Sequence, residues 1–141
     1  MSRTLAIIKP DAVEAGYAGK ILAHLEGSGF NVVALKMSRL TETQAGQFYA
    51  VHRERPFFDA LVAFMTSGPC MPMILEAEDA VSKLRAVIGA TDPAEADEGT
   101  VRDLYAENKE RNAIHASDSD ENAAIEMAFF FSGQAVLDVS G

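Results

Sequence analysis

Cysteine, basic residues and long apolar runs are all scarce in this sequence of 141 residues. Its one cysteine, Cys70, excludes an internal disulfide and fits a reducing compartment. The 12 lysines and arginines are outnumbered by 21 aspartates and glutamates, and the net charge of -9 argues against binding to nucleic acid through a basic face. No apolar run approaches the length of a membrane span or a signal peptide. We therefore expect a cytoplasmic protein with no membrane partner and no specific nucleic-acid partner.

Internal repeats, linkers and low-complexity segments are also lacking. The sequence is 48% hydrophobic and 23% charged, which is ordinary for a globular protein of this length with a substantial core. We expect one domain over residues 1–141.

Two common signatures of phosphate and metal sites fail. The pair Gly19-Lys20 lacks the earlier glycine of a P-loop, because position 14 is glutamate. The acidic run at 118–122 begins like a calcium-binding EF-hand loop, but its sixth place is Ala123 and its twelfth is Phe129. Any phosphate chemistry must therefore use other residues, and the acidic run is better interpreted as a helix start.

Hydrophobic periodicity predicts four strands separated by helices. The predicted strands cover residues 4–9, 30–40, 70–76 and 113–115. The predicted helices cover residues 19–27, 41–52, 57–66, 79–88, 102–106 and 120–131. This order gives a βαββαβ framework with extra helices, as in the ferredoxin-like α+β fold, whose four-stranded antiparallel sheet is covered by helices. The pattern alone leaves several α+β topologies open.

One short segment, NAIHASDS at 112–119, carries the clearest chemical signal. Asp118 followed by Glu121 has the spacing of a capping box, so His115 would lie at the end of a strand just before a helix. The N–H groups and positive dipole end of a helix N-terminus suit anions. A histidine there is a candidate nucleophile for a phosphoryl group. On spacing alone, a surface histidine beside a helix cap remains open.

This segment resembles the active-site signature of the nucleoside diphosphate kinases. Four further segments resemble that family in the same order: IIKPD at 7–11, RERPFF at 53–58, FMTSGP at 64–69 and GATDPA at 89–94. The resemblance runs from Thr4 to about Phe131, and it selects the ferredoxin-like topology. One residue departs, since Ala116 stands where the family usually has glycine.

The resemblance implies an enzyme that transfers the γ-phosphoryl of a nucleoside triphosphate, usually ATP, to a nucleoside diphosphate. It implies a ping-pong mechanism through a phosphohistidine at His115. Glu126 would orient the imidazole, Ser117 would support that arrangement by hydrogen bonding, and the Tyr49 hydroxyl would help to hold the site. Without the resemblance, Glu126 is equally a solvated carboxylate and Tyr49 a packing residue.

The same resemblance implies a set of nucleotide contacts. The phosphates would meet cations and hydroxyls, the sugar would meet an amide and an amine, and the base would stack on an aromatic ring. The residues are Lys9, Arg85, Thr91 and Arg102 for the phosphates, Lys9 and Asn112 for the sugar, Phe57 and Leu61 for the base, and His52 as a lesser contact.

Ordinary alternatives exist for these residues too. Arg85 could lie on a solvated helix face, and Arg102 could form a surface ion pair with Asp103. Phe57 and Leu61 could be core positions of an amphipathic helix. At the level of function, the rivals are a non-enzymatic binding module of the same fold class and a phosphohistidine protein that does not use nucleotides.

The resemblance implies Mg²⁺ as cofactor, arriving as the magnesium–nucleotide complex. The chain would supply few direct ligands, with Asp118 acting through water. The implied partners are nucleoside di- and triphosphates and further copies of the chain. Because the family assembles from dimers and the tail after Phe131 is short, a dimer or a tetramer is favoured over a hexamer.

Overall fold

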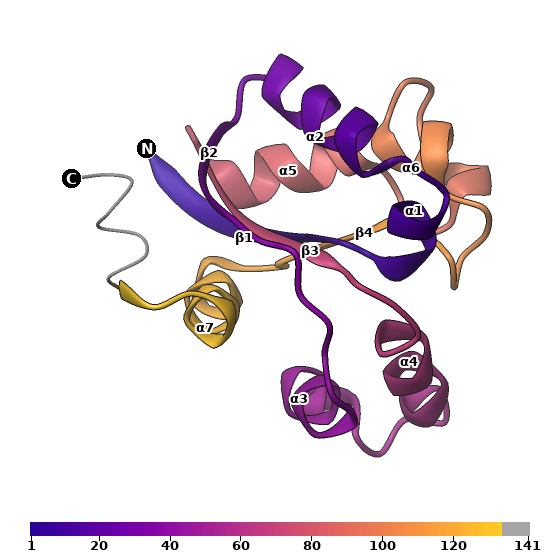
Figure 1. Cartoon of the computed structure of the whole chain (residues 1–141). Coiled ribbons are helices and arrows are strands. Elements are labelled where there is room, and N and C mark those ends of the chain that lie inside the picture. The colour runs from indigo at the N-terminus through magenta and orange to yellow at the C-terminus, as the bar shows by residue number, and fades with distance from the viewer. Residues whose placement is uncertain (134–141) are drawn as a thin grey trace.

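A four-stranded antiparallel sheet forms the centre of the computed structural model, which describes residues 1–133 (Figure 1). The strand order is β2-β3-β1-β4, and every neighbouring pair is antiparallel. This confirms the predicted four-stranded antiparallel sheet. The strands are β1 Ser2–Ile8, β2 Asn31–Leu35, β3 Met71–Ala77 and β4 Ile114–Ala116.

The first strand, β1, lies in the interior of the sheet and is buried on both faces. Leu5 and Ile7 point to one face and Ala6 and Ile8 to the other, and none of the four is exposed. Burying a leucine or isoleucine side chain contributes about 1.5–3 kcal/mol. The continuous apolar run predicted this position, because a strand covered on one face only would alternate with polar residues.

Helices cover both faces of the sheet (Figure 1). One face carries α2, α5 and α6, and the other carries α7 together with α3 and α4. The helices are α1 Pro10–Glu14, α2 Ala18–Gly27, α3 Glu42–Phe48, α4 Phe58–Met65, α5 Ala80–Ile88, α6 Val101–Tyr105 and α7 Asp120–Phe130, with short 3-10 helices η1 Ala50–His52 and η2 Pro93–Glu95.

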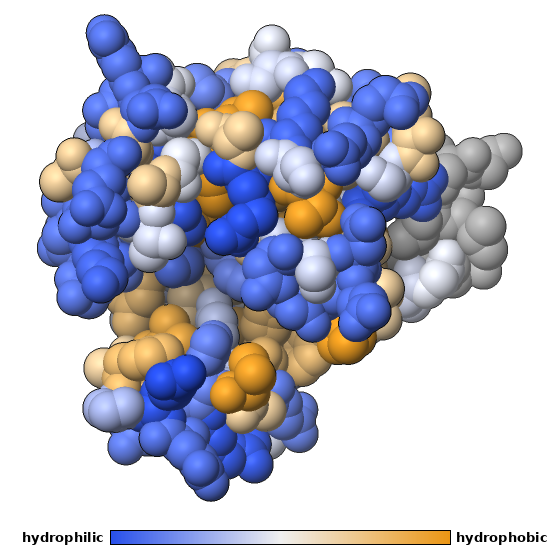
Figure 2. Space-filling model, turned by 180° about the vertical axis from the view of Figure 1, so that it is seen from behind, coloured by the Kyte–Doolittle hydropathy of each residue, from blue (hydrophilic) through white to orange (hydrophobic). Residues whose placement is uncertain are grey.

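The helices α3 and α4 form a lobe at one side of the molecule (Figure 1). The lobe begins at a capping box, in which Thr41 Oγ1 accepts from the Gln44 N–H and the Gln44 side chain accepts from the Thr41 N–H. Seen from behind, a recess separates the lobe from the body of the protein (Figure 2).

Several predicted boundaries were wrong for local reasons. The second strand ends at Leu35, although the chain continues alongside β3 through the Ser38–Cys70 bridge. The predicted helix at 41–52 divides into α3 and η1. Pro10 does end the first strand, but it also starts α1, because proline suits the first position of a helix.

The cap of the last helix also differs from the prediction. Ser119, not Asp118, is the N-cap of α7, and its Oγ accepts from the Asn122 N–H. Asp118 instead accepts from the side-chain amide of Asn122. The residues after 133, on which the expected assembly rests, lie outside the described part of the chain.

Candidate active site

His115 lies in the middle of the edge strand β4, paired with Ile7 of β1. Its neighbours Ile114 and Ala116 point into the core on the α2–α5 face, so His115 points to the opposite face. There it meets α7 and α3. Its side chain is about one-fifth exposed, so one edge of the ring can reach solvent.

A carboxylate on α7 holds the His115 ring. Glu126 Oε1 lies 2.7 Å from His115 Nε2 and also accepts from Ser117 Oγ at 2.8 Å. A carboxylate on Nε2 favours the tautomer that carries its proton there, which leaves the Nδ1 lone pair available. The predicted grouping of these three residues is therefore present in the structure.

Aromatic rings of α3 and its C-terminus pack against the same histidine. The ring centroids of Phe48 and His115 are 5.4 Å apart, and those of Tyr49 and His115 are 6.2 Å apart, both edge to face. The Tyr49 hydroxyl is buried, and it has no hydrogen-bond partner within residues 1–133. Burial raises the pKa of Tyr49, so the phenol stays protonated.

Arg102 on α6 is fixed by backbone carbonyls. Its guanidinium donates to Gly89 O at 3.0 Å and to Ile114 O at 2.7 Å, directly beside His115 in sequence. Gly89 has a φ of 90°, and a Cβ there would lie 2.5 Å from Thr100 Oγ1, so glycine is required. Burial first, and then the nearby Arg85, lower the pKa of Arg102 to about 10, so it is still charged at neutral pH.

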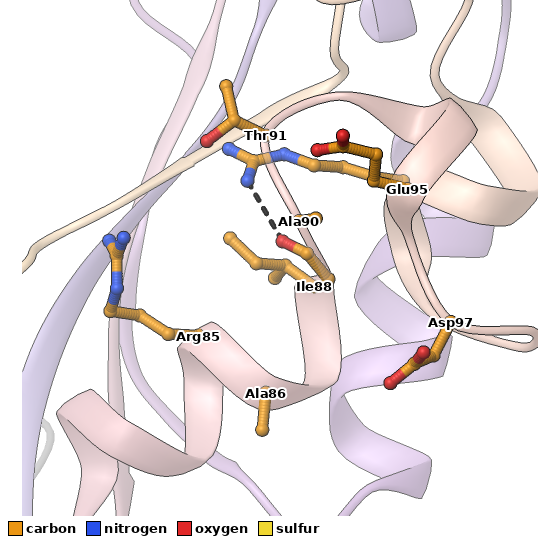
Figure 3. A pocket seen from close by; sticks show the side chains of 9 residues that line it. Arg85, Ala86, Ile88, Ala90, Thr91, Glu95 and Asp97 are labelled. Atoms are coloured by element: carbon orange, nitrogen blue, oxygen red, sulfur yellow. Dashed lines mark hydrogen bonds between the residues drawn. The ribbon is translucent and has the colours of Figure 1, made fainter.

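Arg85, Thr91 and Arg102 line a hollow of about 330 Å³ beside β4. Figure 3 shows Arg85 on α5 and Thr91 on the following loop turned toward the same space. Arg85 Nη1 also approaches Ala116 O at 3.5 Å, which places it next to the strand of His115. Glu95 and Asp97 line the same hollow, and sequence reasoning did not find them.

Lys9 and Asn112 form a buried hydrogen-bonded pair that reaches the loop of Thr91. Lys9 Nζ donates to Asn112 Oδ1 at 2.9 Å, and Asn112 Nδ2 donates to Thr91 O at 3.2 Å. Desolvation is the main cause that lowers the pKa of Lys9 to about 8; Arg102 lowers it further and Asp11 opposes both. This group therefore changes charge close to physiological pH.

Asp11 contacts the residue after Asn112, although no functional role was predicted for it. The residue is only 4% exposed, and its Oδ2 accepts from the Ala113 N–H at 3.0 Å. Ala113 has a φ of 74°, a value that residues with a Cβ rarely adopt. No local signal could have revealed this contact, since it spans 102 residues.

The α3–α4 lobe carries the predicted base contacts. Phe57, just before α4, is 49% exposed, and Leu61 lies one turn further along that helix. The ring centroids of His52 and Phe57 are 5.4 Å apart. A half-exposed phenylalanine favours a stacking surface over a core position.

Comparison with known proteins shows the family of the chain. A family model described as nucleoside diphosphate kinase matches residues 2–136. The chain belongs to the nucleoside diphosphate kinase family. Proteins of that name from Chlorobium limicola and Chlorobium chlorochromatii are 60% and 62% identical to it over 139 and 137 residues. These alignments cover 99% of both chains in the first case, and 97% of this chain and 98% of the relative in the second.

Solved structures of the family agree. The Aquifex aeolicus nucleoside diphosphate kinase superposes with a TM-score of 0.93 at 51% identity, covering 95% of this chain and 97% of that one. A halophilic nucleoside diphosphate kinase from Halobacterium salinarum, solved in complex with CDP, gives a TM-score of 0.91 at 40% identity, covering 95% and 90%. The ferredoxin-like fold and the phosphotransferase activity, from nucleoside triphosphate to nucleoside diphosphate, are therefore those inferred from the sequence.

The departure at Ala116 is accommodated by the kinase fold. Ala116 pairs with Ala6 of β1, and its methyl packs into the core on the face of the sheet opposite His115. Its backbone is not in the positive-φ region, which among non-glycine residues of the described chain holds only Asp79 and Ala113. Ala116 therefore causes no backbone strain of this kind, and its methyl group occupies no space in the site.

We predict that Ala116→Gly changes kcat/KM for phosphoryl transfer by less than about tenfold, or roughly 1.4 kcal/mol in transition-state terms. The reason is that the lost methyl faces the core, so the main effect should be a small drop in thermal stability. Steady-state kinetics with thermal unfolding would measure both. A gain in activity well beyond tenfold would show that Ala116 distorts the pocket.

Proposed function

We propose that His115 is the nucleophile of a ping-pong reaction. Its Nδ1 attacks the γ-phosphorus of a bound nucleoside triphosphate, and the bond from that phosphorus to the bridging oxygen breaks as the diphosphate leaves. The phosphorylated imidazole keeps its proton on Nε2, where Glu126 balances the new positive charge. The 2.7 Å contact between His115 and Glu126 is the observation that carries this proposal.

In the second half of the reaction, a β-phosphate oxygen of an acceptor diphosphate attacks the phosphorus and the bond to Nδ1 breaks. The histidine returns to its neutral state with no net proton change. Both halves use one site, so donor and acceptor bind in turn. The buried Tyr49 hydroxyl supports the site from the side of α3.

The charge of the moving phosphoryl group would be neutralised by Lys9, Arg85 and Arg102, with Thr91 adding a hydroxyl. Arg102 is prepositioned by its carbonyl partners, so it loses little freedom when phosphate binds. Lys9 and Asn112 would also bind the sugar hydroxyls. Phe57 and Leu61 would hold the base, with His52 as a lesser contact beside the Phe57 ring.

Mg²⁺ would enter with the nucleotide as part of the substrate. Within residues 1–133, no group of three or more His, Cys, Asp or Glu side chains could hold a metal. The ion would be bound mainly by phosphate oxygens and water, with the exposed Asp118 reaching it through water. Hydrogen bonding from Asn122 lowers the pKa of Asp118, which keeps it charged.

We also propose a cytoplasmic enzyme assembled from dimers, as a dimer or a tetramer. No helix among the described residues is long and apolar enough to cross a membrane. The single cysteine, Cys70, is buried, and burial raises its pKa to about 11, so it would be an inert thiol.

A second prediction concerns the phosphohistidine. Incubation with Mg-ATP alone should place an acid-labile phosphoryl group on His115, and any nucleoside diphosphate should remove it. His115→Ala should fold and lose transfer, whereas Glu126→Ala should slow phosphorylation about 10- to 100-fold because the ring loses its partner. Glu121→Ala, on the exposed first turn of the same helix, is the matched control. Robust transfer by His115→Ala would contradict the assignment of His115 as the nucleophile.

The charge of Lys9 predicts a pH dependence. With a pKa of about 8 in the free enzyme, Lys9 is charged below that pH, so kcat/KM should fall above it, approaching tenfold per pH unit. Lys9→Met should be less active, and its kcat/KM should lack this decrease at high pH. Unfolding would not explain the loss: the unfolded chain binds more protons on lysine between about pH 8 and 10.5, so this group raises stability as pH rises. A decrease of kcat/KM at high pH that persists in Lys9→Met would contradict the role of Lys9.

The base and sugar contacts predict broad base acceptance and strict sugar recognition. Stacking on Phe57 does not depend on base edges, so guanosine, cytidine and thymidine diphosphates should all be acceptors, with the larger purine somewhat better. The CDP bound to the Halobacterium salinarum relative supports this. A 3′-deoxy diphosphate should be much poorer, because Lys9 and Asn112 would lose a partner. The kcat/KM values for these acceptors test both points, and either strict preference for one base or an unimpaired 3′-deoxy acceptor would refute the corresponding contact.

A further inference from the structure

We propose that Asp11 is a positioning residue for phosphoryl transfer: its buried carboxylate holds Ala113 in a strained turn and so fixes Asn112 against Lys9. This proposal rests on the sugar contacts proposed above for Lys9 and Asn112. It assigns a function to a side chain that is not itself placed against the nucleotide.

Both backbone polar groups of Ala113, its N–H and its carbonyl, form hydrogen bonds to distant residues. Asp11 Oδ2 accepts from the Ala113 N–H at 3.0 Å, and the Lys9 N–H donates to the Ala113 carbonyl at 2.9 Å. The two partners come from the junction of β1 and α1, which Pro10 makes rigid. Ala113 is therefore held by the segment that carries Lys9.

The backbone of this turn is strained. The Ile114 N–H donates to Asn112 O at 2.9 Å across Ala113, whose φ is 74°. A hydrogen bond over two residues with this φ defines a γ-turn of the rare, strained kind. Strain of this type persists only where surrounding contacts impose it, and it gathers at functional sites. The charge-assisted hydrogen bond that the Asp11 carboxylate accepts from the Ala113 N–H is the contact that imposes it here.

The strained turn determines where Asn112 points. Asn112 is buried, with its amide between Lys9 Nζ and Thr91 O. If Ala113 relaxed to a negative φ, the peptide before it would rotate, and this amide would leave both partners.

Electrostatics support a role beyond packing. Asp11 Oδ1 is buried and has no hydrogen-bond partner among the described residues, a cost that an apolar side chain would avoid. The negative charge of the Asp11 carboxylate raises the pKa of the buried Lys9 ammonium, against the lowering effects of burial and Arg102. Asp11 thus also helps to keep Lys9 charged.

The test compares acceptor kinetics for a nucleoside diphosphate and its 3′-deoxy analogue. Asp11→Ala should lower kcat/KM at least tenfold for the parent acceptor and no more than about threefold for the analogue. The discrimination against the analogue therefore collapses. Ala113→Gly alone should change either value less than threefold, because glycine adopts a positive φ without strain. Combining it with Asp11→Ala should recover at least threefold of the lost discrimination.

Controls separate positioning from stability. Glu42→Ala removes an exposed acid from the first turn of α3, and it should leave kcat/KM unchanged for both acceptors. Asp11→Asn keeps the shape and a weaker, neutral acceptor, so it should fold and still lose about three- to fivefold of the discrimination. An unchanged ratio in Asp11→Asn overturns the proposal even where Asp11→Ala does not fold, and so does an equal loss for both acceptors in Asp11→Ala. A wild-type enzyme that does not discriminate would instead refute the sugar contacts themselves, and this proposal with them.

Discussion

The edge strand β4 pairs with β1 over three residues only, and His115 sits opposite Ile7 in that pairing. Side chains alternate along a strand, so a register shift of one residue would turn His115 into the core and bring Ile114 to the site. The register is protected because Ile114 and Ala116 are buried on the other face. The same pairing places the end of β1 next to the residues before β4, which brings Lys9 within hydrogen-bonding distance of Asn112.

The electrostatics of the site run against those of the whole chain. The protein carries a net charge of -9, yet Lys9, Arg85 and Arg102 gather around one strand. Like charges in a partly buried space repel each other, and burial and mutual repulsion lower the pKa values of Lys9 and Arg102. Backbone carbonyls and the amide of Asn112 reduce that cost with partial charges, and the Asp11 carboxylate raises the pKa of Lys9. In the proposed reaction the triphosphate would add negative charge between these cations, so binding would relieve the repulsion between them.

Most of the fold and much of the site followed from the sequence, for identifiable reasons. Apolar runs revealed β1 and β3, since burial on both faces leaves no polar alternation. The family resemblance implied that Glu126 and Ser117 lie at His115, and the structure brings these three side chains together. By contrast, α1 has five residues and no room for a helical period, so only the proline at its start could have signalled it.

The features that escaped prediction depend on contacts between distant segments. Ala113 looks like an ordinary strand residue in sequence, and nothing nearby indicates its positive φ, because Asp11 imposes it from 102 residues away. The packing of Phe48 against His115 likewise depends on how the α3–α4 lobe docks.

The two ends of the proposed nucleotide site differ in rigidity, and this difference matches what each end must do. At the reacting end, Arg102, Asn112 and His115 are each held by hydrogen bonds from other elements. At the base end, Phe57 is half exposed at the start of α4 and lies beside the His52 ring. Phosphoryl transfer requires atoms fixed to within a fraction of an ångström, whereas stacking tolerates displacement and any base. The predicted broad base acceptance would therefore gain from rigid contacts on the sheet and an adaptable surface on the separate lobe.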